Sequence, residues 1–120
     1  MPEMPEEPTE SMEEVIRRDG RYPPEAFALL QEALARAVKE HYGQRRGEPG
    51  QHHVTGRQLC LALREHARRR WGLLAAAVLE QWNVRSTRDF GNMVFLLVEH
   101  GFMRKTESDS IDDFDDVFDF

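Results

Sequence analysis

Residues 86–101 read Ser-Thr-Arg-Asp-Phe-Gly-Asn-Met-Val-Phe-Leu-Leu-Val-Glu-His-Gly, and we take this stretch as the one that decides the fold. At about 100° per residue, its apolar side chains fall within a sector of about 140°. They are Phe90, Met93, Val94, Leu97 and Val98. Ser86 or Thr87 can cap the start of a helix, and Gly101 can end it. The stretch therefore predicts an amphipathic helix over Thr87–His100.

Two helices are predicted immediately before this one. Thr55 and Gln58 have the spacing of a capping box, which begins a helix that runs to Trp71. After Gly72, the alanine-rich stretch Leu73–Trp82 predicts a second helix. Its inward-facing residues are expected to be Leu74, Ala75, Val78, Leu79 and Trp82. Asn83 is expected to end it in the left-handed conformation.

The first half of the chain predicts two more helices. Ser11 and Glu14 form a second capping-box pattern, which begins a short helix to about Arg18. The pair Pro23-Pro24 opens a helix to about Tyr42, because proline is tolerated in a first turn. Residues 44–52 are expected to form a loop. Residues 1–10 are predicted to be a disordered acidic arm, since they offer too little apolar area to offset ordering; residues 11–120 are predicted to form a single domain.

The residues after Gly101 predict a small β element. Residues 102–106 (Phe-Met-Arg-Lys-Thr) are expected to be extended, and residues 117–120 (Val-Phe-Asp-Phe) alternate apolar and acidic side chains as a strand does. A turn over 107–110 and a helical turn over 111–114 lie between them. The expected fold is mainly α, with about five helices and a short C-terminal two-stranded β element, arranged like a winged helix-turn-helix. A plain helical bundle with an acidic tail is the alternative.

Charge is strongly segregated behind a net value of −6. Residues 1–14 carry six glutamates and no base, residues 36–72 carry nine bases against three acids, and residues 107–120 carry seven acids and no base. Arg57, Arg64 and Arg68 lie within about 60° of one another on one predicted helix. Such a basic face can meet RNA, an acidic protein or the chain's own tail.

The acidic-aromatic segment 107–120 also carries Phe114, Phe118 and Phe120. A buried phenylalanine contributes about 1.5–3 kcal/mol, whereas an exposed ion pair contributes about 0–1 kcal/mol. The aromatic residues are therefore expected to dock the segment on the helices, in preference to leaving it free for a partner.

The winged-helix arrangement would place Thr87–His100 in the recognition position, yet this helix is poorly suited to DNA. Its outward face is expected to show Arg88, Asn92, Phe95 and Glu99, which is one base against one acid. The acidic wing would also repel phosphates. Phe95 and Leu96, on the flank of this helix, suit a protein contact better.

No residue is assigned to catalysis, a cofactor or a metal. Cys60 stands between two leucines and is expected to be a buried, inert thiol. The single cysteine excludes an internal disulfide, which favours a reducing cytoplasm. The histidines show no zinc-ligand spacing, and no glycine-rich phosphate loop is present. No apolar run reaches the roughly 20 residues of a membrane span.

Several stretches resemble an uncharacterised small-protein family of the Planctomycetes–Verrucomicrobia group. These are residues 53–59 (His-Val-Thr-Gly-Arg-Gln-Leu), 78–84 (Val-Leu-Glu-Gln-Trp-Asn-Val), 87–95 (Thr-Arg-Asp-Phe-Gly-Asn-Met-Val-Phe), 112–114 (Asp-Asp-Phe) and 117–120 (Val-Phe-Asp-Phe). The resemblance covers about residues 12–120. It implies no activity, cofactor or catalytic residue.

The sequence thus predicts a non-enzymatic protein–protein interaction module in the cytoplasm, whose partner is another protein. A nucleic-acid-binding regulator that uses the basic helix from Arg57 to Arg70 is the alternative. The expected contact residues are Arg57, Arg64, Arg68, Phe95, Leu96, Phe114, Phe118 and Phe120.

Overall fold

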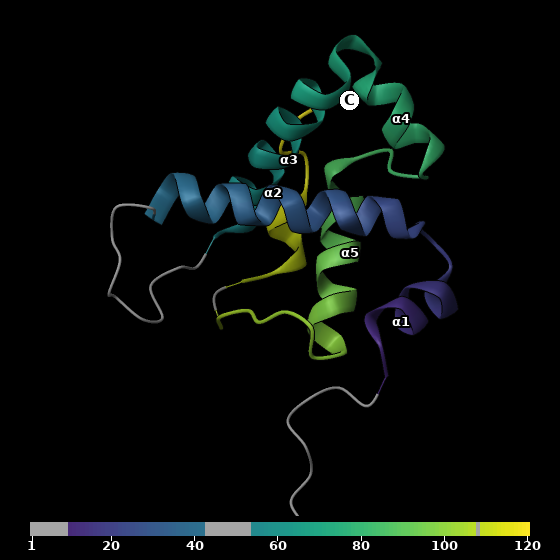
Figure 1. Cartoon of the computed structure of the whole chain (residues 1–120). Coiled ribbons are helices and arrows are strands. Elements are labelled where there is room, and N and C mark those ends of the chain that lie inside the picture. The colour runs from purple at the N-terminus through teal and green to yellow at the C-terminus, as the bar shows by residue number, and fades with distance from the viewer. Residues whose placement is uncertain (1–9, 43–53, 108) are drawn as a thin grey trace, which may run out of the picture.

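The computed structural model describes residues 10–42, 54–107 and 109–120, apart from the side chains of residues 41 and 42. The described residues are mainly helical (Figure 1). The α-helices are α1 (Met12–Asp19), α2 (Pro24–Tyr42), α3 (Gly56–Trp71), α4 (Ala75–Gln81) and α5 (Thr87–Glu99). Short 3₁₀ helices are η1 (Gly72–Leu74), which links α3 to α4, and η2 (Ile111–Phe114), which lies in the acidic-aromatic segment.

Local sequence signals begin and end most of these helices as predicted, although α4 begins at Ala75 and not at Leu73. The Glu14 N–H donates to Ser11 Oγ at 3.1 Å, and the Gln58 N–H donates to Thr55 Oγ1 at 3.1 Å, so both capping boxes are confirmed. Asn83 (φ 65°) adopts the predicted left-handed conformation at the end of α4, and Gly20 (φ 76°) adopts the same conformation at the end of α1. The predicted loop over 44–52 and residues 1–9 of the predicted arm 1–10 lie outside the described residues, whereas Glu10, the last residue of that arm, pairs with Arg18.

The helices pack around one core. α2 crosses in front of α3 and α5, α1 lies beside one end of α2, and α3 and α4 meet at a corner at the top of the view (Figure 1). The most deeply buried large side chains include Leu29, Leu30, Leu63, Phe90 and Leu97. The apolar sector predicted for residues 87–100 therefore faces the core, except that Val98 is only half-buried.

A hydrogen-bond network ties the link between α1 and α2 to the start of α5. The Tyr22 hydroxyl donates to Asp89 Oδ1 at 2.5 Å, and the Asn92 side-chain amide donates to the Tyr22 oxygen at 3.0 Å. The second Asp89 oxygen accepts the backbone N–H groups of Arg85 and Ser86, at 2.8 and 3.1 Å. Burial, together with the hydrogen bond to Asp89, raises the pKa of Tyr22 to about 12.

The predicted two-stranded β element is wrong, because the described residues contain no strand. The N–H groups of Phe102 and Met103 donate to the Leu97 carbonyl and wrap residues 102–103 around the end of α5. Asp116 turns into the left-handed region (φ 51°), which interrupts an extended run before Val117. Without a wing, the winged-helix-like arrangement is not supported, whereas the mainly helical fold is confirmed.

The acidic-aromatic segment nevertheless docks on the helices, as its aromatic residues predict. η2 packs against α5 and α3, and Phe114 is only 3% exposed. The segment then runs alongside α3 from its first turn towards α4, and the C-terminus lies near the corner between α3 and α4 (Figure 1). No described helix has both the length and the apolar character needed to cross a membrane.

Candidate interaction surface

Phe114 anchors the acidic-aromatic segment in a slot between two helical glycines. A Cβ atom on Gly91 of α5 would lie 2.9 Å from both Cβ and Cγ of Phe114, and one on Gly56 of α3 would lie 2.9 Å from its Cε2 atom. Both distances are shorter than van der Waals contact permits. The two glycines therefore allow the ring to enter between α3 and α5.

A buried threonine holds the backbone of this anchor. Thr87 Oγ1 donates to the Phe114 carbonyl at 2.5 Å and accepts the Val117 N–H at 3.2 Å. Thr87 is 1% exposed, so both hydrogen bonds are sheltered from water. Outside them, Arg88 pairs with Asp112 at 3.0 Å and with Asp115 at 2.9 Å on the surface. The expected outward face of α5 is therefore partly covered by the chain's own tail.

The structure corrects the expected exposure of two predicted contact residues. Leu96 is buried at 9% exposure, so the prediction that it faces a partner is wrong. Phe95 is half-buried, and its ring meets Phe114 edge to face with centroids 6.4 Å apart. Phe114 itself is enclosed in the glycine slot. Leu96 is part of the hydrophobic core, whereas Phe95 and Phe114 hold the tail to the body because the helical turn at 111–114 brings Phe114 against α5.

The other predicted contact residues line the outer surface of α3 and the last turn of the tail. Arg57, Arg64 and Arg68 are all exposed on α3. The Arg64 guanidinium lies 5.5 Å from the centroid of the Phe118 ring, and Arg64 and Arg68 share a cavity with Phe118 and Phe120. The structure thus brings four of the predicted residues together and leaves Arg57 nearer the start of the helix.

A second apolar feature was missed by the sequence reasoning. Leu73 is fully exposed and Leu74 is 67% exposed, so the prediction that Leu74 points inward is wrong. Gly72 has φ 58° and ψ −128°, a conformation that glycine adopts readily, and the chain turns there before α4 begins. We call the exposed apolar residues here the η1–α4 surface; they are Leu73, Leu74, Ala76, Ala77 and Phe120.

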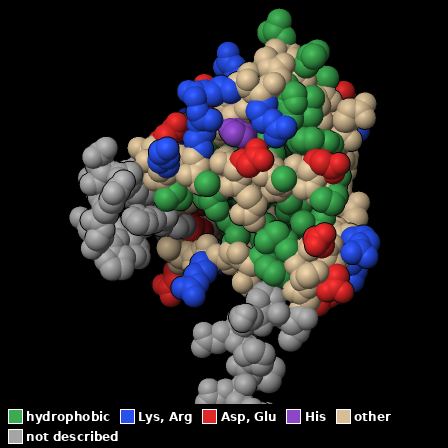
Figure 2. All heavy atoms as spheres, viewed as in Figure 1, with side chains coloured by type: hydrophobic (Ala, Val, Ile, Leu, Met, Phe, Trp, Pro, Cys, Tyr) green, Lys and Arg blue, Asp and Glu red, His purple; other side chains and the backbone are tan. Residues whose placement is uncertain are grey.

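This surface lies at the corner where α3 meets α4. Hydrophobic side chains gather at that end of the molecule, with basic side chains beside them (Figure 2). The rings of Trp71, at the end of α3, and Trp82, just after α4, meet edge to face with centroids 5.4 Å apart and link the two helices. The signal that could have revealed the surface is local, since two leucines and three alanines directly follow a glycine.

Two cavities flank Phe120 on this surface. One, of about 340 Å³, lies between α3 and α4, and we call it the α3–α4 groove. It is lined by Arg64, Ala67, Arg68, Gly72, Leu73, Ala75, Ala76, Leu79, Phe118, Asp119 and Phe120. The other, of about 480 Å³, includes Leu73, Ala76, Ala77, Glu80 and Arg85. Phe120 is 42% exposed, so part of this side chain remains open to solvent.

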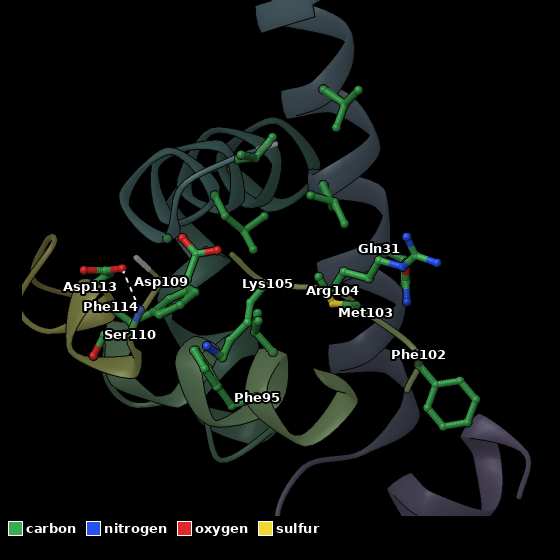
Figure 3. Close-up of a pocket in the computed structure, with 16 residues that line it drawn as sticks. Gln31, Phe95, Phe102, Met103, Arg104, Lys105, Asp109, Ser110, Asp113 and Phe114 are labelled. Atoms are coloured by element: carbon green, nitrogen blue, oxygen red, sulfur yellow. Dashed lines mark hydrogen bonds between the residues drawn. The ribbon is translucent and has the colours of Figure 1, made fainter. Parts of the chain in front are cut away.

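A third cleft, of about 290 Å³, lies between α2, α3, α5 and residues 102–114. Asp109, Ser110 and Asp113 gather near Phe114 at one end, whereas Gln31, Met103 and Phe102 lie towards the other (Figure 3). Arg104 and Lys105 also line it, so this cleft is bordered by charged side chains of both signs.

Two kinds of potentially reactive group can be located in the structure, the single thiol and possible metal ligands. Cys60 is fully buried, and burial raises the pKa of its thiol to about 12. Among the described residues, no three His, Cys, Asp or Glu side chains come together as metal ligands. His52 and His53 lie outside the described residues.

Comparisons with family models, curated proteins and solved structures found no match to this chain. The resemblance to a family of the Planctomycetes–Verrucomicrobia group therefore stays a prediction.

Proposed function

We propose that this chain is a non-enzymatic protein–protein interaction module that uses the η1–α4 surface as its contact face. The supporting observation is the pair of adjacent leucines, one fully exposed and the other 67% exposed. Burying a leucine contributes about 1.5–3 kcal/mol, so covering both would be a substantial driving force for association. Contiguous exposed apolar side chains beside charged residues are typical of protein contact sites.

The position of the tail argues against a winged-helix mode of nucleic-acid binding through α5. The tail packs over α5, the helix expected to read a groove, and Arg88 on this helix already pairs with Asp112 and Asp115. Those carboxylates would face the phosphates of an approaching duplex and repel them. A cytoplasmic location is part of the proposal, and the buried thiol of Cys60 is consistent with a reducing compartment.

A site-specific crosslinking experiment tests the proposal. A photoreactive benzoylphenylalanine at position 74 should form a discrete covalent adduct with another protein in cells of the native host. The matched control is the same residue at position 25, where Glu25 is exposed on α2. Equal adducts at both positions, no adduct at position 74, or an adduct with RNA or DNA would contradict the proposal.

A further inference from the structure

Unpaired positive charge borders the α3–α4 groove. Arg64 and Arg68 line it and are exposed, and neither takes part in an ion pair with any described residue. Their neighbours on the same helix differ, because Arg69 pairs with Glu65 at 2.9 Å and Arg70 pairs with Glu32 at 3.4 Å. The groove therefore combines an apolar wall from Ala67, Leu73 and Ala76 with two cations that can still take a carboxylate.

The chain's own tail shows which chemistry this groove accepts. Phe118 places its ring against Arg64, and Phe118 and Phe120 stack with centroids 5.4 Å apart and planes inclined by 11°. Asp119, between them in sequence, also lines the groove. An acidic-aromatic segment thus already occupies part of the groove, while Leu73 and part of Phe120 remain uncovered.

We propose that the α3–α4 groove binds a short acidic, aromatic peptide segment of a protein partner, next to the Phe120 ring. The partner's carboxylates pair with Arg64 and Arg68, and its aromatic side chain packs between Phe120 and Leu73. This inference rests on the proposed function and names the chemistry of the partner. A second copy fits less well, because face-to-face pairing would bring the same arginines of both copies together.

Fluorescence anisotropy with the full chain and a labelled synthetic peptide, Asp-Asp-Val-Phe-Asp-Phe, tests the inference. We expect saturable binding with a Kd below about 1 mM. Arg68→Glu and Leu73→Asp should each weaken binding at least about tenfold. Both side chains are exposed, so circular dichroism should show unchanged folding. The matched control is Arg17→Glu on α1, at the opposite end of the molecule from α4 (Figure 1), and it should leave binding unchanged.

Three results would overturn the inference. The first is no saturable binding, and the second is equal binding of the neutral peptide Asn-Asn-Val-Phe-Asn-Phe. The third is a different occupant of the groove. A dimer in sedimentation analysis that Leu73→Asp dissociates would show a second copy. A single-stranded oligonucleotide that binds more tightly than the peptide, and whose binding Arg68→Glu abolishes, would show a nucleic acid. A protein adduct at position 74 without peptide binding would refute only this inference, whereas absence of both would refute the proposed function as well.

Discussion

The two aromatic ends of the docked tail are held in opposite ways. Phe114 is 3% exposed, sits between two glycines and has its carbonyl bound by a buried hydroxyl. Phe120, six residues later, is 42% exposed and contacts the rings of Phe118 and Phe90, with centroids 5.4 and 6.0 Å away. Steric fit and sheltered hydrogen bonds fix the first end, whereas surface ring contacts hold the second. The tail is therefore anchored at one end and left accessible at the end nearest the exposed leucines.

Truncating each ring in turn tests this difference directly. Phe114→Ala should lower the free energy of unfolding by about 3 kcal/mol, because it leaves a cavity between α3 and α5. Phe120→Ala should cost less than about 1 kcal/mol, since much of this side chain is already in water. Urea denaturation of both variants measures the two values. Equal losses would show that the two ends are held alike.

Gly91→Ala probes the slot from the side of the helix. Alanine in place of glycine within a helix normally adds up to about 1 kcal/mol of stability. Here the new Cβ would lie 2.9 Å from Phe114 Cβ and Cγ, so we expect a net loss of about 1–3 kcal/mol instead. Thermal and urea denaturation show whether the variant is more or less stable than the unaltered chain. In the Phe114→Ala background the loss should shrink, and a full additive loss would mean that the ring is not what the new methyl meets.

Thr87→Val removes the hydroxyl with little change of shape. The buried Phe114 carbonyl then lacks its donor, which should cost about 1–3 kcal/mol. Thr87→Ser keeps the hydroxyl and is the matched control, with a smaller loss expected. Amide hydrogen exchange at Val117 should quicken in the valine variant, because its N–H loses Thr87 Oγ1 as an acceptor. Unchanged exchange at that amide would contradict the role given to Thr87.

Alkaline pH should weaken the hydrogen bonds between Tyr22 and α5, whereas the side chains of the tail should keep their charge. The folded-state pKa of Tyr22, about 12, lies above its ordinary value of 10.0, so this phenol contributes stability that is complete below pH 10 and is lost as pH rises to about 12. No residue of the segment 111–120 has a side chain that titrates in this window. Urea denaturation between pH 9 and 12 should show that the free energy of unfolding depends less on pH in Tyr22→Phe than in the unaltered chain. An identical dependence would refute the assignment to Tyr22.

Arg88→Gln should have the smallest effect of the set. Its ion pairs with Asp112 and Asp115 are exposed, so water and salt screen them. We expect a loss smaller than that of Thr87→Val, and one that disappears when the salt concentration is raised. Measuring stability at low and at high salt checks this. A loss at low salt as large as that of Phe114→Ala would mean that charge, and not steric fit, fixes the tail.

Sequence reasoning succeeded where the signal is local and failed where distant residues decide. The capping boxes at Ser11 and Thr55 and the left-handed Asn83 depend on neighbours within a few residues, and all three were predicted. The alternation of apolar and acidic side chains over 117–120 correctly indicated that Phe118 and Phe120 lie together, since their rings stack on each other. A strand, however, needs a partner strand, and Phe114 instead directs the tail into a slot formed by Gly56 and Gly91. Nothing local indicates that these two glycines face one ring.

The candidate site illustrates the same limit. The exposed arginines and the aromatic tail could be predicted as contact residues, because charge and aromatic content are visible in the sequence. Leu74 was placed inward because its helical phase was counted continuously from Leu73 to Trp82. The 3₁₀ turn over 72–74 breaks that phase, so both leucines point outward. Leu96 was placed outward, whereas it belongs to the hydrophobic core, because the elements that pack against that side of α5 could not be positioned from the sequence.

The slot between Gly56 and Gly91 has a chemical consequence. Once Phe114 is shortened to alanine, the slot becomes a hollow of roughly one phenyl ring, bordered by Gly56, Gly91 and the Phe95 ring. Benzene or toluene added to that variant should enter the hollow and restore part of the lost stability. The hold of the body on its tail would then be adjustable by a dissolved small molecule.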